Sequence, residues 1–467
     1  MQTVWTAVIL VTYITMLVFV AFRGRAAAEF AEFSLARRRM ALALVFASLS
    51  AAYVGPGFAV GFVGKGFNSG FLFLAIGLAY AVQNILVGLW VAPRLRAFGD
   101  CHTLGDVMDR TYGRSCQVLT GIVSVGLCTG FSAVMAKAGG DIIAEVFGVP
   151  FGLGVVIMVG LTCLYTTFGG LRASVVTDAF QFVTFAILMP AMFLWILAFQ
   201  VQGGLDGFVN KAMISSRTGW NATSTPQIAG LIVAFLLGET LIPPYAHRAL
   251  ASRTTRASRN SFLLAGGFSV LWFTIVVALG VAARGIVPAG THEDSVLITL
   301  VKITMPLPCH ALLLVVLMAI VMSSLDSLLN AGAVSFAKDL AGTLAGFSDR
   351  RSLRVGQLAN VLIAITSVLA AAAVPGIIDG LLVCYSIWAP AILPALVLGL
   401  WLKRPRPLAG LLSMMAGSGA AIALQFIIPK AQVETLGVPT IVAALLVSLV
   451  AYAIGHWFTP SREEGPC

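Results

Sequence analysis

The sequence predicts an all-α membrane protein, a polytopic bundle of about thirteen transmembrane helices arranged as a five-plus-five inverted repeat with broken helices. Three observations predict this fold class. The chain of 467 residues is 59% hydrophobic and only 10% charged, whereas soluble proteins carry roughly 25% charged residues. Apolar stretches long enough to cross a bilayer recur along the whole chain. Two of these stretches, five segments apart, are interrupted by Pro and Gly.

The apolar stretches give the number of spans. A spanning helix needs about 20 mostly apolar residues. Thirteen segments meet this rule, at approximately 4–22, 41–63, 70–92, 117–138, 150–168, 174–200, 226–244, 260–283, 308–337, 353–374, 378–402, 408–428 and 438–458. The first has no basic residue before it and two arginines after it, the reverse of a secretory signal, so we interpret it as a spanning helix.

The basic residues give the orientation. With the N-terminus outside, most of the 29 Lys and Arg residues lie on inside connections, and the bias alternates correctly across the segments. The sequence therefore predicts a multi-pass protein of the plasma (inner) membrane with a cytoplasmic C-terminus. The formal net charge of +10 follows from this topology and from contact with the lipid bilayer. It does not indicate nucleic-acid binding.

No enzyme motif accompanies this topology. The chain has no phosphate-binding loop, zinc-spaced cluster or nucleophile elbow, which argues against an ATP-driven pump and against an enzyme. Its seven cysteines form no paired motif, so we expect neither a metal site nor a disulfide. Nothing implies an oligomer, and residues 1–467 are interpreted as a single transmembrane domain.

The second and seventh segments carry matching interruptions. SLSAAYVGPGFAVGFVG, residues 48–64, has Gly-Pro-Gly at 55–57. LLGETLIPPYAHRAL, residues 236–250, has two prolines at 243 and 244. Proline removes a backbone donor, and such a break persists in a membrane where the freed groups find partners or line a cavity. An ordinary proline kink is the alternative for either segment alone.

The spacing of the two breaks predicts a repeat. Because five is odd, two five-helix units would have opposite orientations in the membrane. We predict a first inverted repeat at 41–200, a second at 226–402, and peripheral helices within 1–40 and 403–467. Paired interrupted segments in two inverted halves point to the binding site of a transporter.

MSSLDSLLN, residues 322–330, gives an apolar helix a polar face. Ser323, Asp326, Ser327 and Asn330 are spaced i, i+3, i+4, i+7. A carboxylate at mid-bilayer costs at least ~2.5–3.5 kcal/mol, so it needs a partner or an ion. Hydroxyls, a carboxylate and freed carbonyls suit a hard cation such as Na⁺. Alternatively, the serines bond back to the preceding turn and Asp326 pairs with a base.

Two further acids lie within predicted spans. Asp178, in GGLRASVVTDAFQFV, is a candidate ion ligand, and its alternative is an interfacial aspartate close to Arg172. Glu239 lies in the second break and is a candidate solute-binding residue. It could pair with a base, face the cavity or be protonated, and these alternatives stay open.

The motifs GGLRASVVTDAFQF, MSSLDSLLNAGAVSFAKDL and PPYAHRALASRTTRASRNS together resemble the sodium/solute symporter family over nearly the whole chain. The resemblance implies the leucine-transporter-type fold, alternating access and Na⁺ as the coupling ion. It further implies a sodium site formed by the hydroxyls that match Ser323 and Ser324 and by the carbonyls that match Ala51, Val54 and Ile320.

The resemblance also implies a second sodium site, which some members of the family have. Its positions match Asp178, Ser323, Asp326 and Ser327, and Asp326 is a departure from the hydroxyl of sugar-carrying members. Two nearby carboxylates would repel strongly at low dielectric. We expect a second Na⁺ between them, giving two Na⁺ per solute, because the nearest base in sequence, Arg172, is expected to face the inside surface. A shared proton is the alternative.

The solute is less defined. Sugar-carrying members have polar side chains where this chain has Gly57 and Phe58, which disfavours a sugar. Exposed amides at Gly55 and Gly57 could bind a carboxylate, as helix starts do. A quaternary ammonium could instead be bound through cation–π contact by aromatic residues near the breaks, namely Tyr53, Phe58, Tyr385 and Trp388.

The sequence therefore predicts a Na⁺-coupled symporter that imports a small organic solute by alternating access, with the identity of the solute open. One alternative is a proton-coupled transporter that uses Asp178, Asp326 or Glu239. The other is a transporter-like domain that senses a solute.

Overall fold

The structure is a computed structural model of the chain, and it describes residues 2–23, 27, 29–222, 225–429 and 438–458. Its described part is built from helices, which are α1 (Gln2–Arg23), α2 (Phe30–Leu35), α3 (Leu42–Tyr53), α4 (Phe62–Ser69), α5 (Leu72–Leu86), α6 (Ala92–Ala97), α7 (Leu104–Tyr112), α8 (Arg114–Phe147), α9 (Phe151–Phe199), α10 (Gly204–Ala222), α11 (Thr225–Leu237), α12 (Pro243–Ala251), α13 (Thr255–Ala283), α14 (Val296–Thr304), α15 (Leu307–Ser335), α16 (Thr343–Ala345), α17 (Asp349–Ala371), α18 (Ile377–Trp401), α19 (Pro407–Ile422) and α21 (Thr440–Phe458).

The membrane-spanning character of these helices follows from their length and composition. In the described part, nine helices are long and apolar enough to cross a membrane, and a pair bent by 64° at the first break makes a tenth. Two predicted segments, 150–168 and 174–200, lie within the single helix α9, which is interrupted at Gly170 (φ 57°, ψ −158°). The predicted fold class is confirmed, whereas the count of thirteen spans is not.

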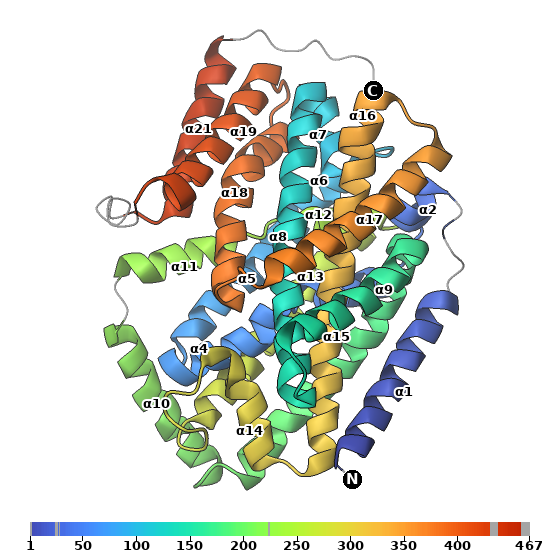
Figure 1. Ribbon diagram of the computed structural model, residues 1–467. Coiled ribbons are helices and arrows are strands. Elements are labelled where there is room, and N and C mark those ends of the chain that lie inside the picture. Colours follow the sequence, from blue (N-terminus) through green and yellow to red (C-terminus); the bar gives the residue numbers. More distant parts are fainter. Residues whose placement is uncertain (1, 24–26, 28, 223–224, 430–437, 459–467) are drawn as a thin grey trace.

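Helix α15 occupies the middle of the bundle (Figure 1). It packs against α8, α9 and α17. In its most apolar stretch of 18 residues, 94% of the residues are buried inside the protein. In α9 the corresponding share is 22%. The polar face of α15 is therefore enclosed by other helices and does not face lipid, which is where ionisable groups in membrane helices are tolerated.

The predicted peripheral helices lie at the edges of the bundle. Figure 1 shows α19 and α21 side by side, next to α18, and α1 at the opposite edge. Helix α1 packs on α9 and α15. The division into two repeats at 41–200 and 226–402, with peripheral helices outside them, stays a prediction.

Close packing of α4 against α13 positions one half of the first broken span. A Cβ at Gly280 would lie 2.1 Å from the Val63 carbonyl oxygen, and one at Gly66 would lie 2.7 Å from the Val277 carbonyl oxygen. Only glycine allows two helix backbones to approach this closely. The contact fixes α4, and with it the break that precedes it, against α13.

Candidate functional site

The first broken span ends one helix and starts another within a few residues. Helix α3 ends at Tyr53, and the chain resumes as a π-helical turn at Gly57–Gly61 that continues into α4. The bonds that bridge the break run from the Val54 amide to the Ser50 carbonyl, and from two later amides to the Gly55 carbonyl. Among the described residues, none of these bridging bonds ends on the carbonyl of Ala51 or Val54. Freed carbonyls of this kind can receive a cation.

A side chain from another helix satisfies one carbonyl at this break. Trp272 Nε1 of α13 donates to the Phe58 carbonyl oxygen at 2.9 Å. Tyr245 Oη of α12 lies 3.4 Å from the Ala52 carbonyl oxygen, but its shorter contact is with Glu239 Oε1. An unpaired carbonyl in a membrane costs roughly several kcal/mol, so the Trp272 bond helps the break to persist.

The second break lies between α11 and α12 and is strained. Leu241 has φ of 49°, a left-handed conformation that is rare for a bulky residue, and it is 1% exposed. The Thr240 carbonyl oxygen accepts a bond from Trp388 Nε1 at 2.9 Å, and Thr240 Oγ1 accepts one from Gln83 Nε2 at 2.7 Å. Both predicted breaks are therefore real interruptions, held by side chains from neighbouring helices.

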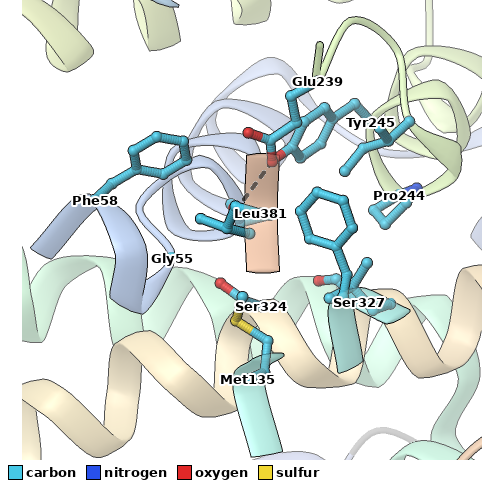
Figure 2. Close-up of a pocket in the computed structure, with 13 residues that line it drawn as sticks. Gly55, Phe58, Met135, Glu239, Pro244, Tyr245, Ser324, Ser327 and Leu381 are labelled. Atoms are coloured by element: carbon cyan, nitrogen blue, oxygen red, sulfur yellow. Dashed lines mark hydrogen bonds between the residues drawn. The ribbon is translucent and has the colours of Figure 1, made fainter. Parts of the chain in front are cut away.

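A small pocket, with a free volume of about 20 Å³, lies between the two breaks (Figure 2). Figure 2 shows Glu239 and Tyr245 on one side of this pocket and Ser324 and Ser327 on the other. The lining residues come from both broken spans and from α8, α15 and α18; they are Ala52, Gly55, Phe58, Phe131, Met135, Glu239, Ile242, Pro244, Tyr245, Ser324, Ser327, Leu328 and Leu381. The structure thus brings the two interrupted segments to one enclosed site.

Ser323 and Ser324 of α15 lie against the first break. A Cβ at Gly55 would be 3.3 Å from Ser324 Oγ. Ser324 is 4% exposed, and its Oγ has no hydrogen-bond partner in the described part of the chain. Ser323 Oγ donates to Asp178 Oδ1 at 2.7 Å, which leaves its lone pairs free. The Ser324 hydroxyl beside the broken segment is an oxygen ligand of the kind that fits Na⁺.

Asp178 is paired with a base that the sequence interpretation placed at the inside surface. Arg248 Nη2 lies 2.6 Å from Asp178 Oδ2, and both side chains are buried, with exposures of 1% and 0%. Ser48 Oγ also donates to Asp178, and Arg248 donates to Ser327 Oγ at 2.5 Å. The expectation that no basic side chain reaches the acids is therefore wrong, and so is the interfacial pairing of Asp178 with Arg172, which contacts Glu32 instead.

Asp326 lies in the same buried network but contacts hydroxyl groups. Ser174 Oγ donates to Oδ1 at 2.9 Å and Tyr165 Oη to Oδ2 at 3.0 Å. Ser327 Oγ lies 3.0 Å from Oδ1, and Thr177 Oγ1 lies 3.3 Å from Oδ2. Hydroxyl donors favour an ionised carboxylate. Asn330, the last residue of the predicted polar face, donates to the Phe33 carbonyl oxygen at 3.4 Å and belongs to a helix contact.

The predicted solute residues separate into two groups. Gly55, Phe58 and Glu239 line the pocket. Three others lie outside its lining. Gly57 faces Leu381, since a Cβ there would lie 2.3 Å from Leu381 Cδ1. Tyr385 Oη donates to Glu239 Oε2 at 2.5 Å, and Trp388 bonds the second break, so these two hold other site residues in place.

Sequence reasoning missed Arg248, Tyr245 and the hydroxyls around Asp326. It ended the seventh segment at residue 244 and counted Arg248 with the inside bases. All nine residues of α12 are buried. The two prolines place PPYAHRALA beside a break, but nothing in the sequence pairs Arg248 with Asp178, 70 residues away.

A second, larger cavity of about 420 Å³ is lined by polar residues from α8 and the connection before α14, including Lys137, Asp141, His292 and Asp294. Burial raises the pKa of the Asp294 carboxyl. Ile377 of α18 lines this cavity, and Leu381, one turn later, lines the central pocket. An apolar layer on α18 therefore separates the two spaces.

Known proteins resemble the chain over most of its length. A model of the sodium:solute symporter family matches residues 33–417. A sodium/pantothenate symporter of Escherichia coli is 24% identical over 78% of this chain and 76% of that protein. An osmoregulated proline transporter of Bacillus subtilis is 26% identical over 83% and 81%, and a sodium/mannose cotransporter of Bos taurus is 26% identical over 76% and 68%.

Solved structures support the fold. A Na⁺-coupled sialic acid symporter in a substrate-bound, outward-open state superposes with a TM-score of 0.86 at 16% identity, over 99% of each chain. A manganese transporter of Eremococcus coleocola superposes with a TM-score of 0.54 at 14% identity, over 89% of this chain and 95% of that one. At these identities the likeness concerns the arrangement of helices.

Proposed function

The chain belongs to the sodium:solute symporter family, and from this premise we propose which residues bind the coupling ion and the solute. As a member, it is a secondary active symporter that couples a solute to Na⁺ by alternating access, and its family is one of transporters and not of enzymes. The relatives named above carry different solutes, so the solute of this chain is a matter for proposal.

We propose that the coupling Na⁺ binds between α15 and the first break, at Ser323, Ser324 and the carbonyls of Ala51, Val54 and Ile320. The observation that carries this proposal is the buried Ser324 hydroxyl, which lacks a hydrogen-bond partner in the described part and lies against Gly55. An unpaired buried hydroxyl is costly, and a cation that takes its lone pair offsets that cost. The freed carbonyls at the break would complete the ligand set.

Binding of Na⁺ to the purified protein tests this site. Na⁺ should raise the thermal unfolding temperature relative to K⁺ at equal ionic strength, because an ion that binds the native state stabilises it. Ser324→Ala should reduce this shift, and any remainder would come from the second cation site proposed below. Ser124→Ala is the matched control, since Ser124 is also a buried serine whose Oγ has no partner among the described residues, but it lies on α8 outside the site. Equal shifts in both variants would reject the site.

The acidic network supports a second cation. Asp178, Asp326 and Arg248 together carry one net negative charge if both acids are ionised. Arg248 is bonded to Asp178 and Ser327, and Asp326 has no base in contact in the described part. We therefore keep the predicted second Na⁺ and place it at Asp326 and Ser327, next to Asp178. A proton on Asp326 is the competing account, and it would make the protein partly proton-coupled.

The solute would bind in the pocket between the breaks. Gly55, Phe58 and Glu239 line it. Outside the lining, Tyr385 donates a hydrogen bond to Glu239 and Trp388 donates one to the Thr240 carbonyl. Gly57 packs against Leu381. The pocket shares Ser324 with the proposed ion site, so ion and solute would occupy one continuous space. This shared space is the physical basis for coupling, because each occupant changes the free energy of binding the other.

The direction of transport rests on the basic residues. Their distribution supports a protein of the plasma (inner) membrane with the N-terminus outside and the C-terminus cytoplasmic, and thus import down the sodium gradient. Under this orientation the polar cavity near Asp294 faces the outside. A solute sensor would bind the same ligands without moving them, so accumulation of solute in sealed vesicles separates the two functions.

A further inference from the structure

We propose that the solute is a small organic cation, a protonated or quaternary amine, whose positive charge is bound by Glu239 and the aromatic rings beside it. This inference rests on the proposed function for the location of the pocket. It goes further by choosing among solute classes that the sequence left open.

The charge of the pocket is the first support. Glu239 is 3% exposed and lines the pocket. None of the described residues that line the pocket is Lys, Arg or His. A carboxylate solute would meet another carboxylate at low dielectric with no base in the lining, because Arg248, which reaches Ser327, is already paired with Asp178. A neutral solute would gain little from a buried acid that costs free energy to desolvate.

The position of Glu239 is the second support. Tyr385 Oη donates to Oε2 at 2.5 Å, and Tyr245 Oη donates to Oε1. Both donors are hydroxyls, which offset part of the cost of burying an ionised carboxylate and hold it in one orientation. Each oxygen takes one bond from tyrosine and keeps acceptor capacity for an N–H group of a ligand. Tyr385 is fixed in turn by Gly238, where a Cβ would lie 2.5 Å from Tyr385 Cβ.

The rings are the third support. Phe58, Phe131 and Tyr245 line the pocket together with the acid. They belong to a larger aromatic cluster: the Phe58 ring lies 4.6 Å from that of Tyr80, and the Phe131 ring lies 5.7 Å from that of Tyr385. A cation within about 6 Å of a ring face gains roughly 0.5–2 kcal/mol by cation–π attraction. Apolar walls with one acid suit an amine with a small apolar substituent.

The alternative of a carboxylate held by backbone amides finds less support at the first break. The side of Gly57 is covered by Leu381 and Ile377, and a Cβ at Gly57 would lie only 2.3 Å from Leu381 Cδ1. At Gly57 the start of the π-helical turn is therefore packed against α18. The negative charge of Glu239 would also offset the repulsion between a cationic solute and the Na⁺ proposed at Ser324.

A comparison of matched probes tests the proposal. Thermal unfolding of the purified full chain is measured with propylammonium and tetramethylammonium as cations, butan-1-ol as the neutral probe and butanoate as the anion, each in Na⁺ and in K⁺ buffer. We expect stabilisation by at least one of the cations and by neither of the other probes. Glu239→Gln should abolish it. Glu145→Gln should retain it, because Glu145 is an acid paired with Lys302 outside the central pocket.

The outcomes separate this inference from the proposed function. Stabilisation by butanoate or butan-1-ol, or by no probe while Na⁺ alone still stabilises, overturns the cation assignment and leaves the sodium site intact. A cation response that survives in Glu239→Gln also overturns it. A cation response in K⁺ buffer with no effect of Na⁺ supports the inference but contradicts the proposed sodium site.

Discussion

Arg248 Nη2 lies 2.6 Å from Asp178 Oδ2 in the centre of the bundle, and the two residues come from helices on either side of the second break in the chain. The pair links α12, which follows that break, to the second half of α9. Ser48 of α3, the helix that precedes the first break, contacts both side chains. One ion pair therefore connects both broken spans, and a movement of either break would have to move or break it.

This ion pair should contribute strongly to stability. Removing one partner leaves an uncompensated buried charge, so Arg248→Gln and Asp178→Asn should each destabilise the protein by about 3–5 kcal/mol. The double variant should lose less than the sum of the two. Unfolding temperatures in detergent are compared for the unmodified protein, the two single variants and the double variant.

The partly exposed pair of Lys65 and Glu293 is the matched control. Its single and double variants should differ from the unmodified protein by about 1 kcal/mol or less, because solvent screens such pairs. Additive losses for Arg248 and Asp178 would show that the two side chains act independently.

The second break should depend on glycine at position 238. In Gly238→Ala the new Cβ would lie 2.5 Å from Tyr385 Cβ and 2.3 Å from the Ala234 carbonyl oxygen. Overpacking of this kind costs about 1–3 kcal/mol, and here it would also displace Tyr385 from Glu239. Gly126→Ala is the control, because the structure describes nothing within 4 Å of a Cβ there and α8 gains a better helix former. Equal unfolding temperatures would contradict the close packing.

The aromatic lining should matter for solute binding in a position-dependent way. Phe58→Ala should weaken binding of the stabilising probe, because Phe58 lines the pocket. Phe19→Ala should leave it unchanged, because Phe19 is 60% exposed on the peripheral helix α1. Isothermal titration of the purified variants measures both. If the two variants bind alike, the rings serve packing and the solute binds elsewhere.

The number of sodium ions per solute tests the acidic network. With the second cation at Asp326, tracer sodium and solute should enter vesicles in a ratio of two to one, with a Hill coefficient near two. Asp326→Asn removes the net negative charge and should lower both values to about one. A ratio of one in both proteins, with uptake that acidifies the vesicle interior, would assign the second charge to a proton.

The fold and the breaks could be predicted from the sequence because they depend on local signals. Apolar length predicts spans, and Pro and Gly at 55–57 and 243–244 mark the interruptions that the structure contains. Glu239 and Phe58 could be assigned to a pocket for the same reason. Arg248 could not, because its partner Asp178 is 70 residues away and charge alone placed it at the surface. Tyr385 and Trp388 are predicted to bind the solute, but they lie outside the pocket lining, because only packing decides whether a ring faces a cavity or supports its wall.

The most direct test of the account is uptake into sealed vesicles of the solute that the stabilisation screen identifies. The account predicts uptake that requires an inward Na⁺ gradient, and Ser324→Ala should raise the Na⁺ concentration for half-maximal uptake while Ser124→Ala leaves it unchanged. Equal uptake driven by a proton gradient in Na⁺-free buffer, with Ser324→Ala behaving like the unmodified protein, would contradict it.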